Sequence, residues 1–321
     1  MGNSEVSMIA VNMSDIASSN QAKVLLETLD WENIGPVEEK QSYRLGNVRM
    51  WMFDDRILNE DNIDIRWFQQ TGEKVTEVIF PSKHSASSGK PSLTLHPIGV
   101  PHLEYGTKPP FGGKAGHAPP PSTRLSSWWK MLQEYVKGTT LEQEFELTLE
   151  VTHHGPWLGV PALFIEIGST ESTWSHMSAA KLLASIITDG MALKQGNAIG
   201  TWDCEENAGE LVLITLGGGH YAPRANKLAS LDGIWLGHML ATYSLPFVKS
   251  EVEGDIPGGT WKQAIESAVS ATQLAFPNGK IICSMDKKAF KGWQRQAIRN
   301  YLIDIDIPLL TTKQITEALT N

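Results

Sequence analysis

The chain has 321 residues, of which 41% are hydrophobic and 20% are charged, a composition typical of a globular protein with a sizeable core. Its formal net charge of −9 argues against a chain-wide electrostatic grip on nucleic acid, because such binding depends on Lys and Arg neutralising phosphates. A local basic patch is compatible with that charge. The two cysteines, Cys204 and Cys283, exclude a disulfide framework and favour a reducing compartment.

The N-terminal segment lacks the basic region, apolar core and cleavage site of a signal peptide. No apolar run approaches the ~18 residues that a membrane span requires. We therefore expect a soluble cytoplasmic protein that could also be nuclear and that has no membrane partner. We expect it to be a monomer or a small homo-oligomer.

Strands and helices alternate in the first part of the sequence. The patterns predict a strand over 7–13, a helix capped by Ser18, Ser19 and Asn20 that runs to about 29, strands over 48–53 and 75–80, a helix over 61–70, and a short strand over 93–96. Residues 97–122 are dominated by Gly and Pro, which predicts a long loop with a functional role. Ser122 caps a further helix that ends near 137.

The centre of the sequence carries two strand patterns joined by a pair of histidines. Residues 145–152 alternate between apolar and polar, whereas 162–167 are almost continuously apolar, as in a strand covered on both faces. His153 and His154 precede Gly155-Pro156, which breaks the first strand and lets both histidines serve one site at a sheet end. Glu166 stands inside the apolar strand, where a carboxylate needs a partner or a metal ion.

The remaining sequence continues the alternation. It predicts a helix over 175–189, strands over 211–216 and 234–238, a helix over 261–276, a strand over 281–285 and a helix from 291 to about 302. This order predicts a single α/β domain over 1–321, with three α/β/α layers, a mostly parallel or mixed sheet and the loop insertion at about 97–122. Ligands of such sheets bind beyond the strand ends.

Histidines gather at those predicted strand ends, and with Glu166 they form a candidate site. Zinc accepts histidine nitrogen and carboxylate oxygen, and a catalytic zinc activates bound water. The histidine spacing matches no short zinc signature, so a metal-free site with histidine as the base and Glu166 orienting it is the alternative. From residue chemistry we assign His84, His96 and His153 to a metal ion, and His154, Glu166 and His220 to catalysis.

Two further stretches suit a phosphate-bearing ligand. The strand over 211–216 leads into Gly217, Gly218 and Gly219, whose backbone N–H groups are predicted to approach the ligand closely, with Arg224 just beyond. The densest basic cluster, at Lys287, Lys288 and Lys291, follows the last predicted strand. A solvated charged face is the plainer interpretation of that cluster.

Six sequence blocks, in this order, resemble the signature of the archaeal- and plant-type D-aminoacyl-tRNA deacylases, and the plant branch most closely. The blocks are SKHS (82–85), LTLH (93–96), THHGP (152–156), EIGS (166–169), GGGHYAPR (217–224) and KAFKGW (288–293). The resemblance implies hydrolysis of the ester between a D-amino acid and the tRNA 3′ end, including aldehyde-modified forms in the plant branch. It also implies zinc and a phosphorylase/hydrolase-like fold related to that of peptidyl-tRNA hydrolases.

This resemblance implies tRNA, not DNA, as the partner. The acceptor end must then be held locally, and we expect Arg224, Lys287, Lys288 and Lys291 to contact it. Two other functions remain open: a zinc-dependent peptidase or amidohydrolase on the same fold, and a non-catalytic RNA-binding module. The net charge of −9 does not favour the RNA-binding module.

Overall fold

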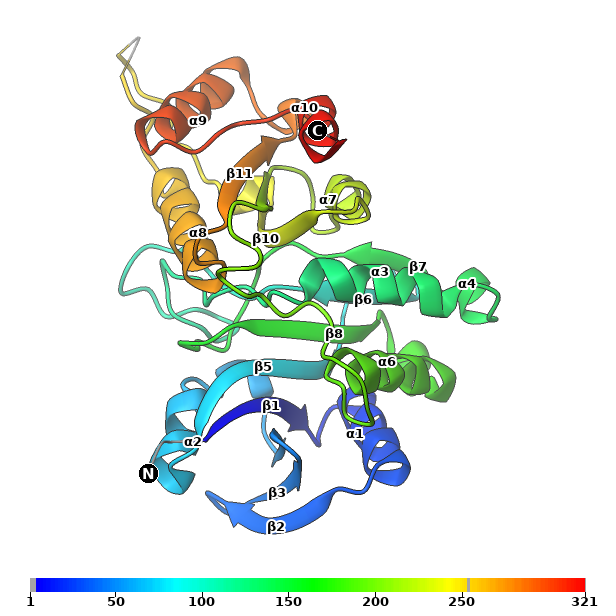
Figure 1. The fold of residues 1–321 in the computed structure, drawn as a ribbon. Coiled ribbons are helices and arrows are strands. Elements are labelled where there is room, and N and C mark those ends of the chain that lie inside the picture. Colours follow the sequence, from blue (N-terminus) through cyan, green and yellow to red (C-terminus); the bar gives the residue numbers. More distant parts are fainter. Residues whose placement is uncertain (1–3, 253–254, 321) are drawn as a thin grey trace.

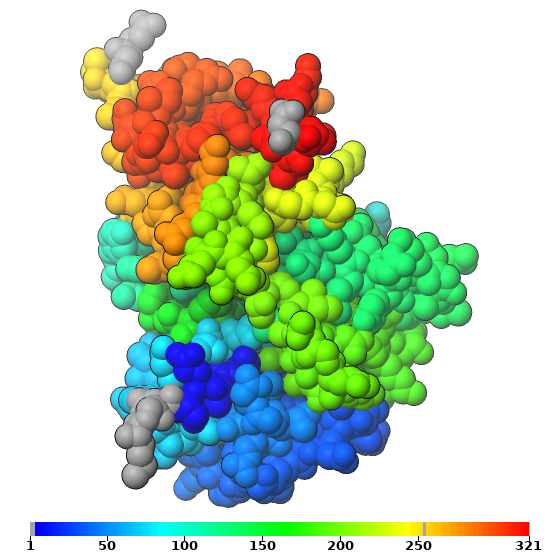
Figure 2. All heavy atoms as spheres, viewed as in Figure 1, coloured from blue at the N-terminus to red at the C-terminus, as the bar shows by residue number. Residues whose placement is uncertain are grey.

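The computed structural model describes residues 4–252 and 255–320. Its backbone forms an eight-stranded sheet and a separate three-stranded sheet, flanked by helices (Figure 1). The N-terminal and C-terminal parts of the chain lie at opposite ends of the molecule (Figure 2). The predicted α/β class with a large, mostly parallel sheet is confirmed.

The large sheet has the strand order β2-β3-β4-β1-β5-β8-β6-β7. Neighbouring strands in the centre are parallel, whereas β6 runs antiparallel to β8, and β2, β3 and β4 form an antiparallel edge. The strands are β1 (Glu5–Asn12), β2 (Glu32–Val37), β3 (Lys40–Leu45), β4 (Val48–Phe53), β5 (Lys74–Lys83), β6 (Ser92–His96), β7 (Glu146–Leu149) and β8 (Ala162–Gly168).

The small sheet is entirely parallel, with β9 (Leu211–Leu216) between β10 (Ile234–Leu240) and β11 (Lys280–Met285). Helices cover both sheets. They are α1 (Ile16–Thr28), α2 (Ile63–Thr71), α3 (Leu125–Val136), α4 (Leu141–Glu144), α5 (Glu171–Trp174), α6 (Met177–Gly190), α7 (Pro223–Ala229), α8 (Trp261–Ala275), α9 (Gly292–Asp304) and α10 (Thr312–Thr320). Among the described helices, every one is too short or too polar to span a bilayer.

The hydrophobic core connects the two sheets. Helices α1, α3 and α6 lie on one face of the large sheet (Figure 1), and their apolar side chains share one core with residues of the small sheet such as Leu213 and Leu236. Helix α2 covers the opposite face, where Trp67 packs near Phe80 and Phe164. The two sheets therefore share buried apolar contacts, and these contacts fix the position of one sheet relative to the other.

Several element boundaries differ from the sequence prediction. Helix α1 begins earlier than predicted, because Asp15 and not Ser18 is its N-cap and accepts from the amides of Ala17 and Ser18. Strand β7 ends at Leu149, and only the Glu150 amide continues to donate to β6, at the carbonyl of Leu95. The sequence did not predict six of the described strands and α-helices: β2, β3, α4, α5, α7 and α10.

Residues 97–122, all of them described, form no helix and take part in sheets only through isolated bridges at Ile98 and Pro121. The loop is nevertheless packed against the protein. Its Gly99 amide donates to the carbonyls of His153 and His154, and its Phe111 carbonyl accepts from the Gly155 amide. The long loop is thus attached to the histidine pair.

Candidate active site

Glu166 is the centre of the candidate site and comes from inside β8, where only 2% of it is exposed. Its Oε2 lies 3.7 Å from Nδ1 of His84 and 3.5 Å from Nε2 of His96. His84 follows β5 and His96 ends β6, the two strands that flank β8. Because β5 is parallel and β6 antiparallel to β8, the two histidines approach Glu166 from opposite directions. These side chains therefore meet over β8, next to the carboxyl ends of the parallel strands β1 and β5, whose last residues Asn12 and Lys83 line the adjacent cavity.

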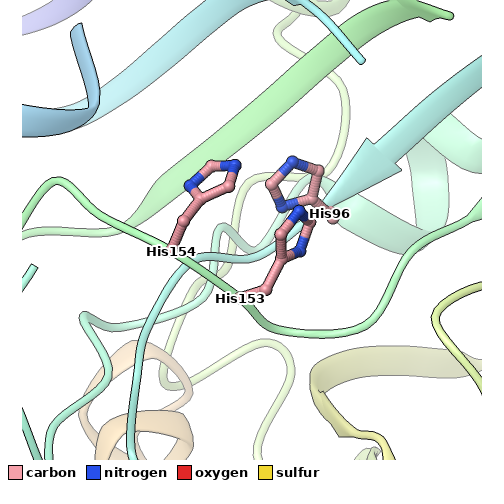
Figure 3. Close-up of side chains that lie close together, drawn as sticks. All are labelled: His96, His153 and His154. Carbon is pink, nitrogen blue, oxygen red and sulfur yellow. The ribbon is translucent and has the colours of Figure 1, made fainter. Parts of the chain in front are cut away.

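The two neighbouring histidines complete one side of this site. Figure 3 shows the rings of His153 and His154 converging with that of His96 from a separate chain segment. The ring centroids of His96 and His153 are 4.2 Å apart, and those of His96 and His154 are 5.0 Å apart. His154 has a φ of 41°, a left-handed conformation that non-glycine residues adopt at a cost. The sequence prediction that both histidines serve one place is consistent with this geometry.

Glu150, which the sequence analysis did not select, is the second buried carboxylate of the site and is fully buried. Its Oε2 accepts from Nε2 of His220 at 2.8 Å and lies 3.1 Å from Nδ1 of His84. Two tyrosines complete these contacts. The Tyr221 hydroxyl lies 3.3 Å from Nε2 of His84, and the Tyr243 hydroxyl lies 3.1 Å from Nδ1 of His220. A second cluster thus joins histidines of both sheets through one carboxylate.

Glu150 escaped prediction because it occupies a polar position of an alternating strand, which normally faces solvent. Here the small sheet covers that face. The Val151 amide donates to the carbonyl of His220, and the Thr152 amide donates to the carbonyl of Met239. The only sequence signal for Glu150 was its place in a strand pattern that leads directly into His153.

The two carboxylates have opposite pKa shifts. Burial alone would raise the pKa of Glu150, but the hydrogen bonds from His220 and His84 outweigh it, so the pKa lies well below its usual range. Burial raises the pKa of Glu166, and the neighbouring His96 opposes this only in part. Burial acts to lower the pKa of His84, yet Glu150 outweighs it and the pKa is raised. Such divergent environments are typical of functional sites.

Three histidines have donor atoms that lie within 4.8 Å of one another. Nδ1 of His96, His153 and His154 lies 3.1, 2.7 and 2.7 Å from the backbone carbonyls of Pro97, Val151 and Gly155. A carbonyl only accepts, so each Nδ1 carries a proton, and neutral His153 and His154 offer a lone pair at Nε2. Nε2 of His96 faces Oε2 of Glu166, which outweighs burial and raises the pKa of His96. Burial keeps His153 and His154 neutral by lowering their pKa, to about 3 for His154.

This arrangement fits a metal ion. Histidine ligands of metals commonly donate their other ring N–H to a carbonyl or carboxylate. Within the described residues, Nε2 of His96 and Oε1 of Glu150 are buried without a hydrogen-bond partner. Three groups of donor atoms lie within 4.8 Å: His96, His153 and His154; His84, Glu150 and His220; and His96, Glu150 and Glu166.

The donor groups differ from the division that we drew from the sequence. No such group among the described residues combines His84, His96 and His153, although Nδ1 of His84 and Nε2 of His153 lie 3.1 and 3.7 Å from the same Oε2 of Glu150. His154, assigned to catalysis, belongs with His96 and His153. His220, also assigned to catalysis, belongs with His84. All six predicted residues of the centre are nonetheless close together.

A cavity of about 270 Å³ opens onto these residues. Among its lining residues are His84, His153, His154, Glu166 and His220. Asn12, the last residue of β1, and Asp15, the N-cap of α1, line it as well. Its volume lies near the lower end of about 300–1,000 Å³ for small-molecule sites, so it suits one small group.

The glycine loop is used differently from the prediction. The Gly217 amide donates to the carbonyl of Leu240, and the Gly218 amide donates to Oγ1 of Thr242. These two N–H groups are therefore not free for an anion, because they hold the loop against β10 and the segment after it. The role of Gly219 as a backbone donor stays a prediction.

The predicted basic contacts lie on the side of the small sheet. Nη2 of Arg224 bonds to Oγ of Ser284, whereas its buried Nη1 has no partner among the described residues. Lys287 and Lys288 are exposed in a short 3-10 turn, and Lys291 is exposed at the start of α9. A Cβ on Gly217 would meet Ala289 and Phe290, so this basic cluster is next to the glycine loop.

His238, a fully buried histidine on β10, lies outside the donor groups above. Its Nε2 lies 3.1 Å from the carbonyl of Pro119, which can only accept, and its Nδ1 lies 2.9 Å from Oγ1 of Thr152. The ring is therefore neutral, and burial lowers its pKa to about 4. His238 thus links β10 to the long loop and to the segment that carries His153.

We expect His238 to make stability depend on pH. An unfolded histidine binds a proton below about pH 6.5, whereas folded His238 does so only near pH 4. Stability is hence lost as pH falls through this window, by about 2 kcal/mol between about pH 7 and pH 5. Urea unfolding of the wild type and of His238→Gln, which keeps a donor and an acceptor but does not titrate, measures the difference. An equal pH dependence in both proteins would contradict the prediction.

Comparison with known proteins places this chain in a family. The family model for D-aminoacyl-tRNA deacylase matches residues 71–310. A D-aminoacyl-tRNA deacylase of Arabidopsis thaliana is 42% identical over 309 residues, which cover 94% of this chain and 97% of that protein. One from Methanosarcina barkeri is 29% identical over 98% of this chain and 92% of its own length.

A solved structure supports the fold. The crystal structure of AF0625, a conserved protein of unknown function, superposes with a TM-score of 0.76 over 99% of this chain and 98% of that chain, at 24% identity. The sequence matches extend over nearly the whole chain and include the segments that carry the histidines. The chain therefore belongs to the D-aminoacyl-tRNA deacylase family.

Proposed function

We propose that this protein hydrolyses the ester that links a D-amino acid to the 3′ end of tRNA, and so removes D-amino acids from mischarged tRNA. The observation that carries the proposal is a cluster of five histidines and two buried carboxylates in a chain of this family. Four of the histidines and Glu166 line a small cavity. Ester hydrolysis needs an activated water and groups that move protons, and this cluster offers both types of residue.

The residues divide into two tasks in this proposal. His96, His153 and His154 have donor atoms within 4.8 Å of one another and would hold a zinc ion, which when bound lowers the pKa of a coordinated water. His84 and His220 lie on the other side, oriented by Glu150. They are placed to accept or return a proton, because their remaining ring nitrogens face Tyr221 and Tyr243.

The substrate range and partner belong to the same proposal. The sequence blocks are closest to the plant branch, so we include D-aminoacyl-tRNAs whose amino group carries an aldehyde modification. The aminoacylated 3′ end of tRNA is the proposed partner, and the cytoplasm is the proposed place of action. Arg224, Lys287, Lys288 and Lys291 border the glycine loop and remain proposed contacts for tRNA phosphates.

Stereoselective hydrolysis is the direct test. Purified protein is expected to release tyrosine from D-Tyr-tRNA at least about a hundredfold faster than from L-Tyr-tRNA. The reason is that a proofreading enzyme must bind the transition state for the L-isomer much more weakly than that for the D-isomer. Release of labelled amino acid from each substrate, measured at equal concentrations, gives the ratio. Spontaneous ester hydrolysis without protein is the control.

Three outcomes would contradict this function. Equal rates on both substrates would exclude proofreading, and tRNA binding without any hydrolysis would instead favour an RNA-binding module. Hydrolysis of small D-amino acid amides but not of D-Tyr-tRNA would favour the peptidase or amidohydrolase alternative.

A further inference from the structure

Two pairs of cationic and aromatic side chains lie at the rim of the active-site cavity. The guanidinium of Arg56 lies 5.3 Å from the ring centre of Phe111, and the ammonium of Lys83 lies 4.4 Å from that of Trp174. Arg56, Lys83 and Phe111 line the cavity together with His84 and His154. Neither pair belongs to the basic cluster on the small-sheet side.

The first pair is fixed beside His154. The Phe111 carbonyl accepts from the Gly155 amide at 3.0 Å, one residue after His154. A Cβ on Gly112 would lie only 1.5 Å from the carbonyl oxygen of Leu58, so the loop lies against the turn η1 (Ile57–Asn59) that follows Arg56. The contact between the loop and the turn η1 thus holds the Arg56 guanidinium against the Phe111 ring.

The second pair is fixed beside His84. The Lys83 amide donates to Oδ2 of the buried Asp15 at 2.8 Å, which holds the strand end in place. Nε1 of Trp174 donates to the carbonyl of His84 at 2.7 Å. The Lys83 ammonium is exposed, so its charge is available at the rim while its backbone is rigid.

Packing does not account for Phe111, because 51% of this phenylalanine is exposed. An exposed aromatic ring combined with a guanidinium plane is a surface on which an unpaired nucleobase stacks. Asp54 and Asp55 precede Arg56 and are exposed, which disfavours a phosphate directly at Arg56. The ammonium of Lys83 is better placed for a phosphate contact.

We propose that Phe111 with Arg56 is the stacking platform for an unpaired base at the 3′ end of tRNA, and that Lys83 contacts an adjoining phosphate. The inference rests on the proposed function and specifies how that substrate is held. The cavity of about 270 Å³ has room for an aminoacyl group but not for a chain of nucleotides. The nucleotides must therefore lie outside it, on this rim, when the ester reaches His84 and His154.

Binding of an RNA hairpin tests the platform without turnover. One hairpin ends in a single-stranded ACCA tail and a second, otherwise identical hairpin is blunt. Fluorescence anisotropy is expected to show that Phe111→Ala weakens binding of the tailed hairpin about tenfold and leaves the blunt hairpin unaffected, since only the tail offers unpaired bases. Phe111→Trp is expected to retain wild-type affinity, because tryptophan stacks at least as well.

Kinetics with D-Tyr-tRNA add a second readout. Phe111→Ala is expected to raise KM about tenfold while kcat stays within about threefold, because the ring positions nucleotides and does not touch the ester. Phe68→Ala is the matched control, since Phe68 is 41% exposed on α2 and does not line the cavity.

Unchanged affinity of Phe111→Ala for the tailed hairpin, or an equal loss for both hairpins, would overturn the platform. The binding measurement can be made even if the wild type fails to hydrolyse D-Tyr-tRNA. Such a failure would contradict the proposed function but not the platform.

Discussion

Replacing Glu150 with Gln is expected to lower kcat for D-Tyr-tRNA about a thousandfold, as removal of a proton-transfer partner does in other enzymes. The Glu150 carboxylate faces His84 and His220 at once, and it raises the pKa of His84. Glutamine keeps the size and one acceptor oxygen but removes the charge that supports both rings. Single-turnover measurement on D-Tyr-tRNA isolates this effect from tRNA binding.

Glu150→Gln should remain folded, because a buried amide costs less to desolvate than a buried carboxylate. Glu38→Gln is the control: Glu38 pairs with Arg66, which retains Glu60, and lies away from the cavity. We expect wild-type kcat for this control. If Glu150→Gln keeps kcat within a few-fold of wild type, the carboxylate only fills space and the proposed proton-transfer pair is wrong.

Removing metal is expected to have the second large effect. Protein prepared without a histidine tag should contain zinc, and a chelator should lower activity at least about a hundredfold, with recovery on adding zinc. The melting temperature should fall as well, because an ion that binds only the folded state stabilises it. Elemental analysis and thermal unfolding therefore report on the site even without substrate.

A pair of histidine variants localises the metal. His96→Gln is expected to lose bound zinc, because His96 belongs to two of the three donor groups. His176→Gln is the matched control, since His176 caps α6 and contacts Glu144 outside the donor groups. If His96→Gln still binds zinc at full stoichiometry, the metal site lies elsewhere. Full activity in a metal-free sample would exclude a catalytic metal.

The sequence predicted the central strands and helices because their apolar patterns are strong. The continuous apolar run at 162–167 matches β8, which is buried on both faces. The hairpin β2–β3 was missed because its residues are mostly polar and partly exposed at the sheet edge, so no alternation marks them. Helix α7 was missed because it is only seven residues long. Helix α10 carries Ile315, Ala318 and Leu319 at helical spacing, a signal that the sequence prediction passed over.

The candidate site was predictable in composition but not in arrangement. Histidines at strand ends and a carboxylate inside an apolar strand can be recognised in the sequence. In the structure, His84 and His96 do lie next to Glu166. Their grouping depends on which strands flank β8 and on the antiparallel direction of β6, which are properties of the whole sheet. Glu150 depends on the small sheet covering a strand face that its pattern assigns to solvent.

The junction of the two sheets has a consequence for synthesis on the ribosome. His84, His96, His153, His154 and Glu166 emerge with the strands of the large sheet, whereas His220 and the backbone partner of Thr152 come from the small sheet. The cluster around Glu150 can therefore close only after β9 and β10 have been translated and have folded. A nascent chain that stops before them would carry most of the ligand histidines without the complete centre, so hydrolytic competence is expected only after the small sheet has formed.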